Sequence, residues 1–325
     1  MTAAALAGTS RGGSGLREVN PRRDMEGIAT LLETAFAGEL DPYGLHMVRE
    51  MRAFGRAGWL GWLVGRLFLP PAAYPLGFVW LEQGRVVGNA SLLPVSGFPQ
   101  RWVMANVAVD PDHRRRGIAR ALVKSSLDLA RARGGLEVVL QVRRGNQGAE
   151  ALYTGMRFEV LTTRTTWSRP AGGRLPRIEP SLSVSVRRRA TGEWSQQWDL
   201  ARRFHPEGLL WPFPADASLF RPKPLEGFLD MGGRSHWVSV EAGQVVGSLS
   251  SYIDSSRAGW RVVLIVRPEQ QGTAEGPLVA AALQGANAEG LAVSLDYEAE
   301  VAEEVFLAHG FRPEHTLRWM RLALD

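Results

Sequence analysis

The sequence predicts an α/β protein made of two similar modules that follow one another along the chain. The length of 325 residues suits two domains of ~100–200 residues each. Segments of alternating apolar residues, typical of strands, come between segments with helical periodicity. The order of these segments in the first half of the chain recurs in the second half. Together these observations favour a duplicated mixed α/β fold.

In the first module, a strand at 16–19 precedes a helix that opens at Asn20-Pro21 and has apolar residues at helical spacing. A hairpin follows, with Glu82-Gln83-Gly84-Arg85 as its turn. The remaining elements alternate between strand and helix. The predicted segments are strands at 76–81, 86–95, 102–109 and 137–142, helices at 117–133 and 146–156, and a strand pair near 158–167.

The second module repeats this order at an offset of about 153 to 160 residues. Its turn Gln244-Val245-Val246-Gly247 closely matches Arg85-Val86-Val87-Gly88 of the first hairpin. The predicted segments are strands at 182–186, 237–241, 245–253, 260–266 and 291–297, and helices at 278–289 and 301–309. Proline and glycine gather between the modules, which indicates a linker. We therefore expect a first module at 17–169, a linker at 170–181 and a second module at 182–325.

Composition excludes several classes of function. Hydrophobic residues at 45% and charged residues at 22% are typical of a globular protein. The absence of cysteine excludes disulfides, thiolate metal sites and cysteine nucleophiles. Nearly all of the positive charge comes from arginine, with short runs at 114–116 and 187–189. Neither run belongs to a nucleic-acid reading motif or has an aromatic ladder beside it. We expect an anionic ligand at one of them and no nucleic-acid partner.

The first sixteen residues are small and polar and contain no apolar stretch of ~7–15 residues. They predict a disordered tail at 1–16 and no signal peptide. The longest apolar run, Trp59 to Leu69, is interrupted by Arg66 and is shorter than the ~20 residues that cross a bilayer. We therefore expect no membrane span and a cytoplasmic location.

The most informative stretch is the junction between the strand at 102–109 and the helix at 117–133. The strand ends at Val109, and a turn with three arginines leads to a helix that opens with the small residues Gly117 and Ala119. Helix N-termini offer unpaired N–H groups and a partial positive charge, so they bind pyrophosphate. The turn therefore predicts a diphosphate site, with an ordinary strand–turn–helix junction as the alternative.

A second motif lies further on, at Asn146-Gln147-Gly148-Ala149-Glu150-Ala151-Leu152-Tyr153, with Phe158 after it. Together, the Arg-x-x-Gly-x-Ala turn at 114–119 and this Asn-x-x-Ala-x-x-x-Tyr helix resemble the GNAT superfamily of acetyl-CoA-dependent N-acetyltransferases. The resemblance is close over Val86 to Phe158 and extends in outline to the second module. It implies two tandem GNAT-like modules, each a mixed, mostly antiparallel sheet flanked by helices. Arg157 departs from the family pattern, which has glycine before Phe158.

The resemblance also implies the roles of particular residues. The turn would hold the pyrophosphate of coenzyme A through its backbone amides, and the end of the preceding strand would pair with the pantetheine arm. These cofactor-binding residues are Arg114, Arg115, Arg116, Gly117, Ile118 and Ala119 in the turn, and Val107, Ala108 and Val109 in the strand. Asn146 would contact the arm. Tyr153 would be the general acid, because a phenol of pKa about 10 can protonate a thiolate of pKa about 8.5 within hydrogen-bond reach. A packed helix tyrosine is the alternative.

The general base is not evident. Gln141 stands where ribosomal-protein acetylating members of the superfamily have glutamate, and glutamine cannot accept the amine proton. An ordered water relay, or a carboxylate such as Glu33, Glu39 or Asp41, would have to replace it. Each of these acids could equally be a solvated surface charge.

The second module has lost the residues that carry the chemistry. Ala274 takes the place of the turn glycine, and Glu275 adds a negative charge that should repel a phosphate. Phe306 takes the place of Tyr153, and Ala299 that of Asn146. We therefore expect the second module to be structural, with Asp296 as a polar contact or an exposed strand-end charge.

The implied function is acetyl transfer from acetyl-CoA directly to a primary amine of a small molecule or peptide, by the first module and without a metal. The alternative is a catalytically idle acyl-CoA-binding or regulatory protein. The insertion at Trp59–Leu69 could form an apolar lid, a dimer contact or ordinary core, and His205 belongs to an aromatic cluster at the matching place in the second module. Paired modules within one chain slightly favour a monomer.

Overall fold

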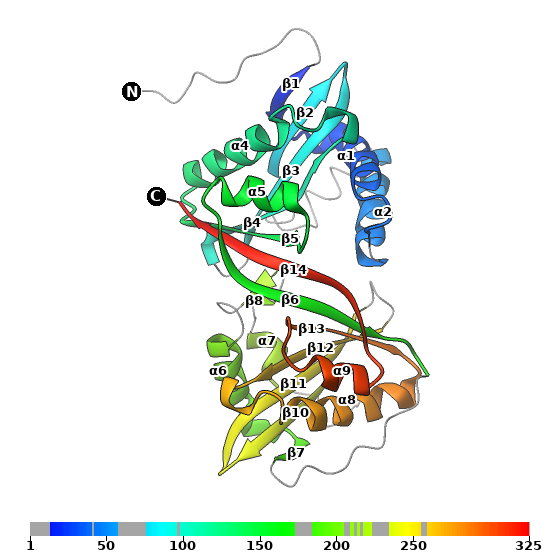
Figure 1. Ribbon diagram of the computed structural model, residues 1–325, viewed down its shortest axis with the longest axis vertical. Coiled ribbons are helices and arrows are strands. Elements are labelled where there is room, and N and C mark those ends of the chain that lie inside the picture. The colour runs from blue at the N-terminus through cyan, green and yellow to red at the C-terminus, as the bar shows by residue number, and fades with distance from the viewer. Residues whose placement is uncertain are drawn as a thin grey trace. The chain divides into compact units, whose positions relative to one another are not determined.

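A computed structural model describes residues 14–40, 42–57, 76–95, 98–172, 184–204, 209–210, 213–214, 217–222, 234–254 and 259–324 (Figure 1). The helices are α1 (Pro21–Ala35), α2 (Pro42–Arg56), α4 (Ile118–Ala132), α5 (Gln147–Thr154), α6 (Trp194–Phe204), α7 (Ala217–Phe220), α8 (Glu275–Glu289) and α9 (Glu303–Ala308). The strands of the first half are β1 (Gly15–Glu18), β2 (Leu76–Glu82), β3 (Arg85–Val95), β4 (Phe98–Val109), β5 (Glu137–Arg143) and β6 (Glu159–Arg169). Those of the second half are β7 (Ser185–Arg188), β8 (Leu209–Leu210), β9 (Phe213–Pro214), β10 (Arg234–Glu241), β11 (Gln244–Asp254), β12 (Gly259–Val266), β13 (Ala292–Glu298) and β14 (Arg312–Ala323).

The chain divides into two compact units, and neither is one continuous stretch of sequence. The first unit consists of Met1–Gln141, Gly148–Glu159 and Met320–Asp325, and the second of Val142–Gln147 and Val160–Trp319. These units differ from the predicted modules in two places. Nearly all of β6 lies in the second unit, and the end of β14 lies in the first. Most of the predicted linker falls outside the described residues, so its bounds stay a prediction.

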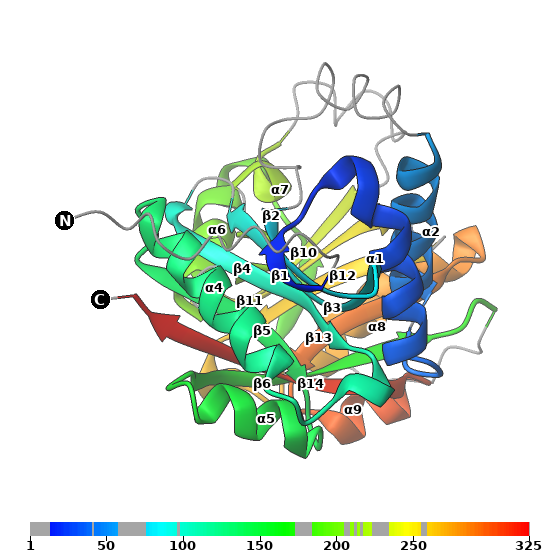
Figure 2. The same cartoon turned by 90° about the horizontal axis from the view of Figure 1, so that it is seen from above.

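In the first unit, β1 to β5 lie in sequence order in the sheet, with antiparallel neighbours except for the parallel pair β4 and β5. The last residues of the chain join this unit, where the Leu324 amide donates to the Leu136 carbonyl at 2.7 Å. The two faces of the sheet are covered by different helices. Apolar residues of α1 pack with Val79 and Ala108, and those of α4 pack with Ala90. Figure 2 shows α1 and α2 side by side.

The helix α1 begins where the sequence predicts. The Asn20 side chain accepts a hydrogen bond from the Arg22 amide at 3.0 Å, and Pro21 occupies the first turn, where its missing N–H costs nothing. Buried Asp24 links this helix to β1, because its carboxylate accepts two hydrogen bonds of 2.7 Å from the guanidinium of Arg17 on that strand. Of the predicted apolar residues of this helix, Ile28, Leu31 and Leu32 are buried, whereas Phe36 follows the last residue of the helix and is partly buried.

In the second unit the strand order is β14-β6-β13-β12-β11-β10-β7. The core lies mainly between this sheet and α8 and contains Leu278, Leu283, Leu295 and Phe306. A smaller cluster joins α6 and α7 to the sheet through Val263 and Ile265. The mixed, mostly antiparallel sheet with flanking helices confirms the predicted fold class in both units.

Several predicted elements were wrong. The predicted strand pair near 158–167 is the single strand β6, because no turn residue interrupts the alternating pattern before Pro170. Residues 15 and 16, predicted as tail, begin β1 and pair with Leu81 and Trp80. The helices α2 and α6 and the strand β14 were not predicted at all. The insertion at Trp59–Leu69, Asp41 and His205 lie outside the described residues. No helix in the described ranges is long and apolar enough to span a membrane.

Candidate functional site

The turn before α4 has the backbone conformation of an anion site. Arg115 and Gly117 both have positive φ, 60° and 77°, and the first bond of α4 runs from the Ala121 amide to the Gly117 carbonyl. Within the described part of the chain, no carbonyl accepts a hydrogen bond from the consecutive amides of residues 115–120. A Cβ built on Gly117 would meet nothing within 4 Å, so the space in front of these amides is open. A row of unpaired amides at a helix N-terminus can bind a phosphate group.

One predicted donor in this turn is already used. The Arg114 amide donates to the Pro111 carbonyl at 3.4 Å, which closes the short 3₁₀ turn at Pro111–His113. The Arg114 side chain bonds the carbonyls of Val109 and Ala35. The open row of amides therefore begins one residue later than the sequence suggested.

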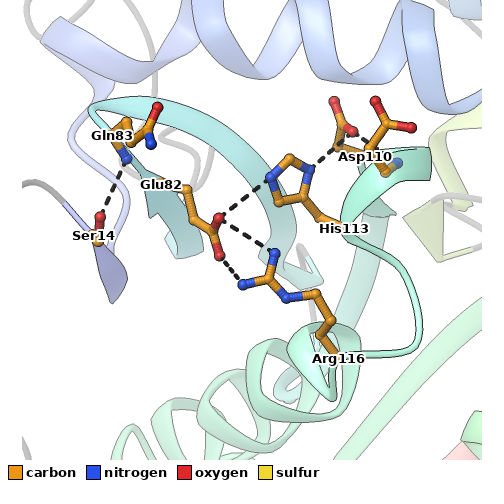
Figure 3. Close-up of polar contacts among 7 residues, drawn as sticks. Ser14, Glu82, Gln83, Asp110, His113 and Arg116 are labelled. Carbon is orange, nitrogen blue, oxygen red and sulfur yellow. Dashed lines mark hydrogen bonds and ion pairs between the residues drawn. The ribbon is translucent and has the colours of Figure 1, made fainter.

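A carboxylate from the β2–β3 hairpin braces this turn (Figure 3). Glu82 forms an ion pair with Arg116 at 2.5 Å, and its other oxygen lies 3.4 Å from the Nε2 of His113. On its opposite side, His113 Nδ1 lies 3.1 Å from Asp110, and this hydrogen bond lowers the pKa of the Asp110 carboxyl. Of the three arginines in the turn, Arg114 and Arg116 thus have side chains that bond to neighbouring residues of the protein. The turn is pre-formed by these contacts.

The second unit contains the same brace at the matching position. There Gln270 donates from Nε2 to the Glu241 carboxylate at 2.7 Å. Glu241 ends β10 as Glu82 ends β2, and Gln270 follows Pro268 as His113 follows Pro111. Because the brace is present in a module without the other site residues, we interpret it as part of the fold and not of the chemistry. It was not predicted from the sequence, although the repeated hairpin glutamate could have indicated it.

The strand β4 opens away from β5 beside the turn. Parallel pairing between the two strands runs from Arg101↔Glu137 to Met104↔Leu140 and goes no further. Just beyond, Asn106 has a positive φ of 54°, and the pairing of β4 with β3 shifts by one residue between Ala105 and Ala108. Val107 to Val109 have no strand partner on the β5 side among the described residues, and the β-bulge before them sets which way they face. The free strand edge can pair with an extended ligand that carries amide groups.

Tyr153 is buried in the first unit. Its side chain is 5% exposed, and its ring meets that of Phe158 edge to face with centroids 5.6 Å apart. Burial raises the pKa of the phenol well above its ordinary value, so the group is protonated at neutral pH. The phenol thus carries a proton that it can donate, and the raised pKa makes it a weaker acid than a free tyrosine. Asn146 is exposed before α5, and its position belongs to the second unit.

Of the predicted candidates for a general base, Glu33 is held in an ion pair and Glu39 is exposed, while Asp41 lies outside the described residues. Arg52 donates to both oxygens of Glu33 at 2.9 and 2.6 Å, and this contact lowers the pKa of the Glu33 carboxyl. Glu39 is exposed after the end of α1. Gln141 is half-buried on β5 and has no basic atom.

In the second unit, the matching turn is filled by the chain itself. Glu275, the first residue of α8, is fully buried, and its carboxyl oxygens accept hydrogen bonds from the Gly272 amide and from the Tyr297 hydroxyl, both at 2.8 Å. The sequence predicted only repulsion between this residue and a phosphate. In the structure its side chain uses a turn amide that a phosphate would need.

The other matching positions of the second unit are also occupied by packing. Phe306 packs edge to face against Tyr297 at 5.3 Å and lies in the apolar core. Asp296 forms an ion pair with Arg261 and accepts a hydrogen bond from Thr166. Asp296 is therefore a polar contact between strands, which is one of the two roles that the sequence left open.

Comparison with known proteins shows a family match for part of the first half of the chain. Residues 38–158 match the Acetyltransferase (GNAT) family. The chain is 37% identical over 81 residues to the [Ribosomal protein bS18]-alanine N-acetyltransferase of Escherichia coli (strain K12). That match covers 25% of this chain and 55% of the relative, so the chain spans about half the length of the relative it matches.

Solved structures show the fold over nearly the whole chain. A GCN5-related N-acetyltransferase from Sphaerobacter thermophilus superposes with a TM-score of 0.62 at 15% identity, covering 95% of both chains. A tandem GNAT protein from the clavulanic acid biosynthesis pathway superposes with a TM-score of 0.52 at 21% identity, covering 95% of this chain and 99% of the other. Residues 38–158 thus match the GNAT acetyltransferase family, and the chain has the fold of a tandem GNAT protein.

Proposed function

We propose that this protein is an acetyl-CoA-dependent N-acetyltransferase in which the first module is active and the second is structural. One observation carries the proposal. The turn of the first unit presents a row of open amides to a phosphate group, whereas the turn of the second unit is closed by Glu275. The open β4 edge beside the first turn and the protonated phenol of Tyr153 add the other parts that such a site needs.

Acetyl-CoA would supply the acetyl group as a thioester. The amides of residues 115–120 would bind its diphosphate, and the open edge of Val107 to Val109 would pair with its pantetheine amides. The acceptor amine forms the new C–N bond with the acetyl carbon, and the C–S bond breaks. Tyr153 gives its proton to the departing thiolate and regains one through solvent, while the amine releases its proton through ordered water because Gln141 cannot accept it. The products are the acetamide and free coenzyme A.

The first test is calorimetric titration of acetyl-CoA into the wild-type protein and into Gly117→Glu. A glutamate there would be forced into a positive-φ position and would place a carboxylate in front of the open amides. We expect micromolar binding at one site per chain in the wild type and none in the variant. No binding to the wild type would overturn the proposal, and two equal sites would overturn the assignment of the second module.

The second candidate function is an idle acyl-CoA-binding or regulatory protein, favoured by Gln141 and by the ion pair that occupies Glu33. Tyr153→Phe separates the two. The substitution removes only the hydroxyl, so an enzyme should lose kcat by about 10²–10⁴ and keep its coenzyme affinity. Turnover of a panel of small-molecule and peptide amines provides the assay. The absence of turnover in the wild type, with binding intact, would favour the second candidate.

We also propose that the protein acts as a monomer in the cytoplasm, on a primary amine. Light scattering after gel filtration tests the first point, and a mass near 35.7 kDa is the expected result. A mass of twice this value would show a dimer.

A further inference from the structure

We propose that Asn89 is a positioning residue that holds the bulge of β4 and thereby sets the register and the facing of the coenzyme-binding edge at Val107 to Val109. This inference rests on the proposed function and deepens it. Asn89 lies on β3, where its neighbours in the register are Val79 on β2 and Ala108 on β4. Both of those residues belong to the apolar cluster beneath α1. The Asn89 side chain is fully buried beside these two apolar residues. Burial of a polar group is unfavourable, so its presence there needs an explanation.

The contacts of Asn89 supply that explanation. Its Nδ2 donates to the carbonyl of Asn106 at 2.8 Å and to the Oγ of Ser91 at 3.2 Å. Asn106 is the residue with positive φ at the centre of the bulge. The bulge removes this carbonyl from the regular ladder, and the Asn89 amide satisfies it. The Asn89 Oδ1 is buried without a hydrogen-bond partner in the described residues, so this side chain keeps the bond to the bulge at the cost of an unpaired oxygen.

The bulge lies directly beside the strand edge that would pair with the coenzyme. The pairing of β4 with β5 ends at Met104, two residues before Asn106. The extra residue bends β4 just beyond the point where the strands separate, and Val107 to Val109 then run on toward the open turn without pairing to β5. Loss of the bulge would shift this edge by one residue and turn each following side chain to the other face.

The second module provides a natural control. At the position of Asn89 it has Ser248, whose Oγ accepts a hydrogen bond from Gln197 at 2.9 Å. There the register of β11 and β12 runs without a shift from Gly247↔Val266 to Asp254↔Gly259, and no residue of β12 has a positive φ. The same fold without the asparagine thus has a strand without a bulge. Because β12 also stops pairing with β13 after Val262, the asparagine accounts for the bulge and not for the separation of the two strands. Together with the closed turn at Glu275, this regular strand matches a module that holds no coenzyme.

The experiment compares Asn89→Ser, which copies the second module, with Ser91→Ala, which removes the other contact of the Asn89 amide. Acetyl-CoA and ADP serve as probes, because ADP has a diphosphate but no pantetheine arm. We expect Asn89→Ser to bind acetyl-CoA about tenfold more weakly, which corresponds to ~1.4 kcal/mol, with ADP affinity unchanged. Ser91→Ala should leave both affinities near wild type.

Two further measurements separate positioning from general loss of structure. Adding Asn106→Gly to Asn89→Ser should restore part of the acetyl-CoA affinity. Glycine adopts positive φ readily, so position 106 would no longer need the hydrogen bond from the Asn89 side chain. Amide hydrogen exchange of residues 107–109 should be faster in Asn89→Ser than in wild type. Unchanged acetyl-CoA affinity, or equal weakening of both ligands, would overturn the inference. If wild type binds no acetyl-CoA, the proposed function fails, and the exchange rates still decide whether Asn89 holds the bulge.

Discussion

The buried carboxyl of Glu275 allows the sharpest test of the second module. Replacing it with alanine leaves the buried Tyr297 hydroxyl, now 2.8 Å from a Glu275 oxygen, without an acceptor, whereas the amide of exposed Gly272 can bond to water. An unsatisfied buried donor costs about 1–3 kcal/mol, so the Tyr297 hydroxyl predicts a loss of about 1–3 kcal/mol in the free energy of unfolding. Glu275→Gln keeps the shape and an acceptor oxygen, and we expect it to stay within about 1 kcal/mol of wild type.

Acid pH gives a second readout for the same residue. Burial raises the pKa of the Glu275 carboxyl above its ordinary value of 4.5, so the folded state binds a proton more readily than the unfolded state. Between pH 4.5 and the pKa that Glu275 has in the folded protein, this residue therefore makes the protein more stable as the pH falls. Glu275→Gln should lack that gain.

The assay is urea unfolding followed by tryptophan fluorescence, together with hydrogen exchange of the first turn of α8. Exchange is needed because a chain with two units need not unfold in one step. An alanine variant as stable as the glutamine variant would refute the reasoning, since it would show that the turn does not depend on an acceptor at this position.

Three other substitutions test separate parts of the structure. Burial lowers the pKa of His236 from 6.5 to about 3, so stability should fall as the pH drops from 6.5 toward 3, and a smaller fall in His236→Gln is the check. Glu33→Gln breaks the partly exposed pair with Arg52 and should cost under about 1 kcal/mol in thermal unfolding while turnover stays unchanged, whereas lost turnover would make Glu33 the base. Gly88→Ala would put a methyl group 2.9 Å from the Ile118 side chain, so calorimetry should show a destabilisation of about 1–3 kcal/mol.

Much of the fold could be predicted because it is encoded locally. The α4 segment has its apolar residues at helical spacing and glycine just before its first turn, and the structure begins and ends this helix within a residue of the prediction. The hairpin turn at Glu82 to Arg85 contains Gly84 with a positive φ of 78°, the conformation for which glycine is suited. The repeat of this turn at Gly243 is enough to reveal the duplication, because both hairpins continue with the same Val-Val-Gly residues.

Features that depend on distant parts of the chain could not be predicted. The neighbours of β6 in the sheet, β14 and β13, come from much later in the chain, so no local pattern shows what this strand pairs with. The bulge at Asn106 depends on an amide donor seventeen residues away on another strand. In the turn before α8, the Glu275 carboxyl also accepts a hydrogen bond from Tyr297, which lies on β13, later in the chain. The sequence could show that Glu275 was out of place for a phosphate site, but not that it had become part of the core.

The last residues of the chain belong to the first unit, and this affects the order in which the protein can fold during translation. Met320–Asp325 leave the ribosome after the whole of the second unit, yet they belong to the first. During translation, the first unit must therefore wait with the β5 edge near Leu136 unpaired until Leu324 emerges. An unpaired edge can be captured by another chain, so nascent or truncated copies are expected to be the form that aggregates. A fragment that stops at residue 169 would retain that exposed edge permanently.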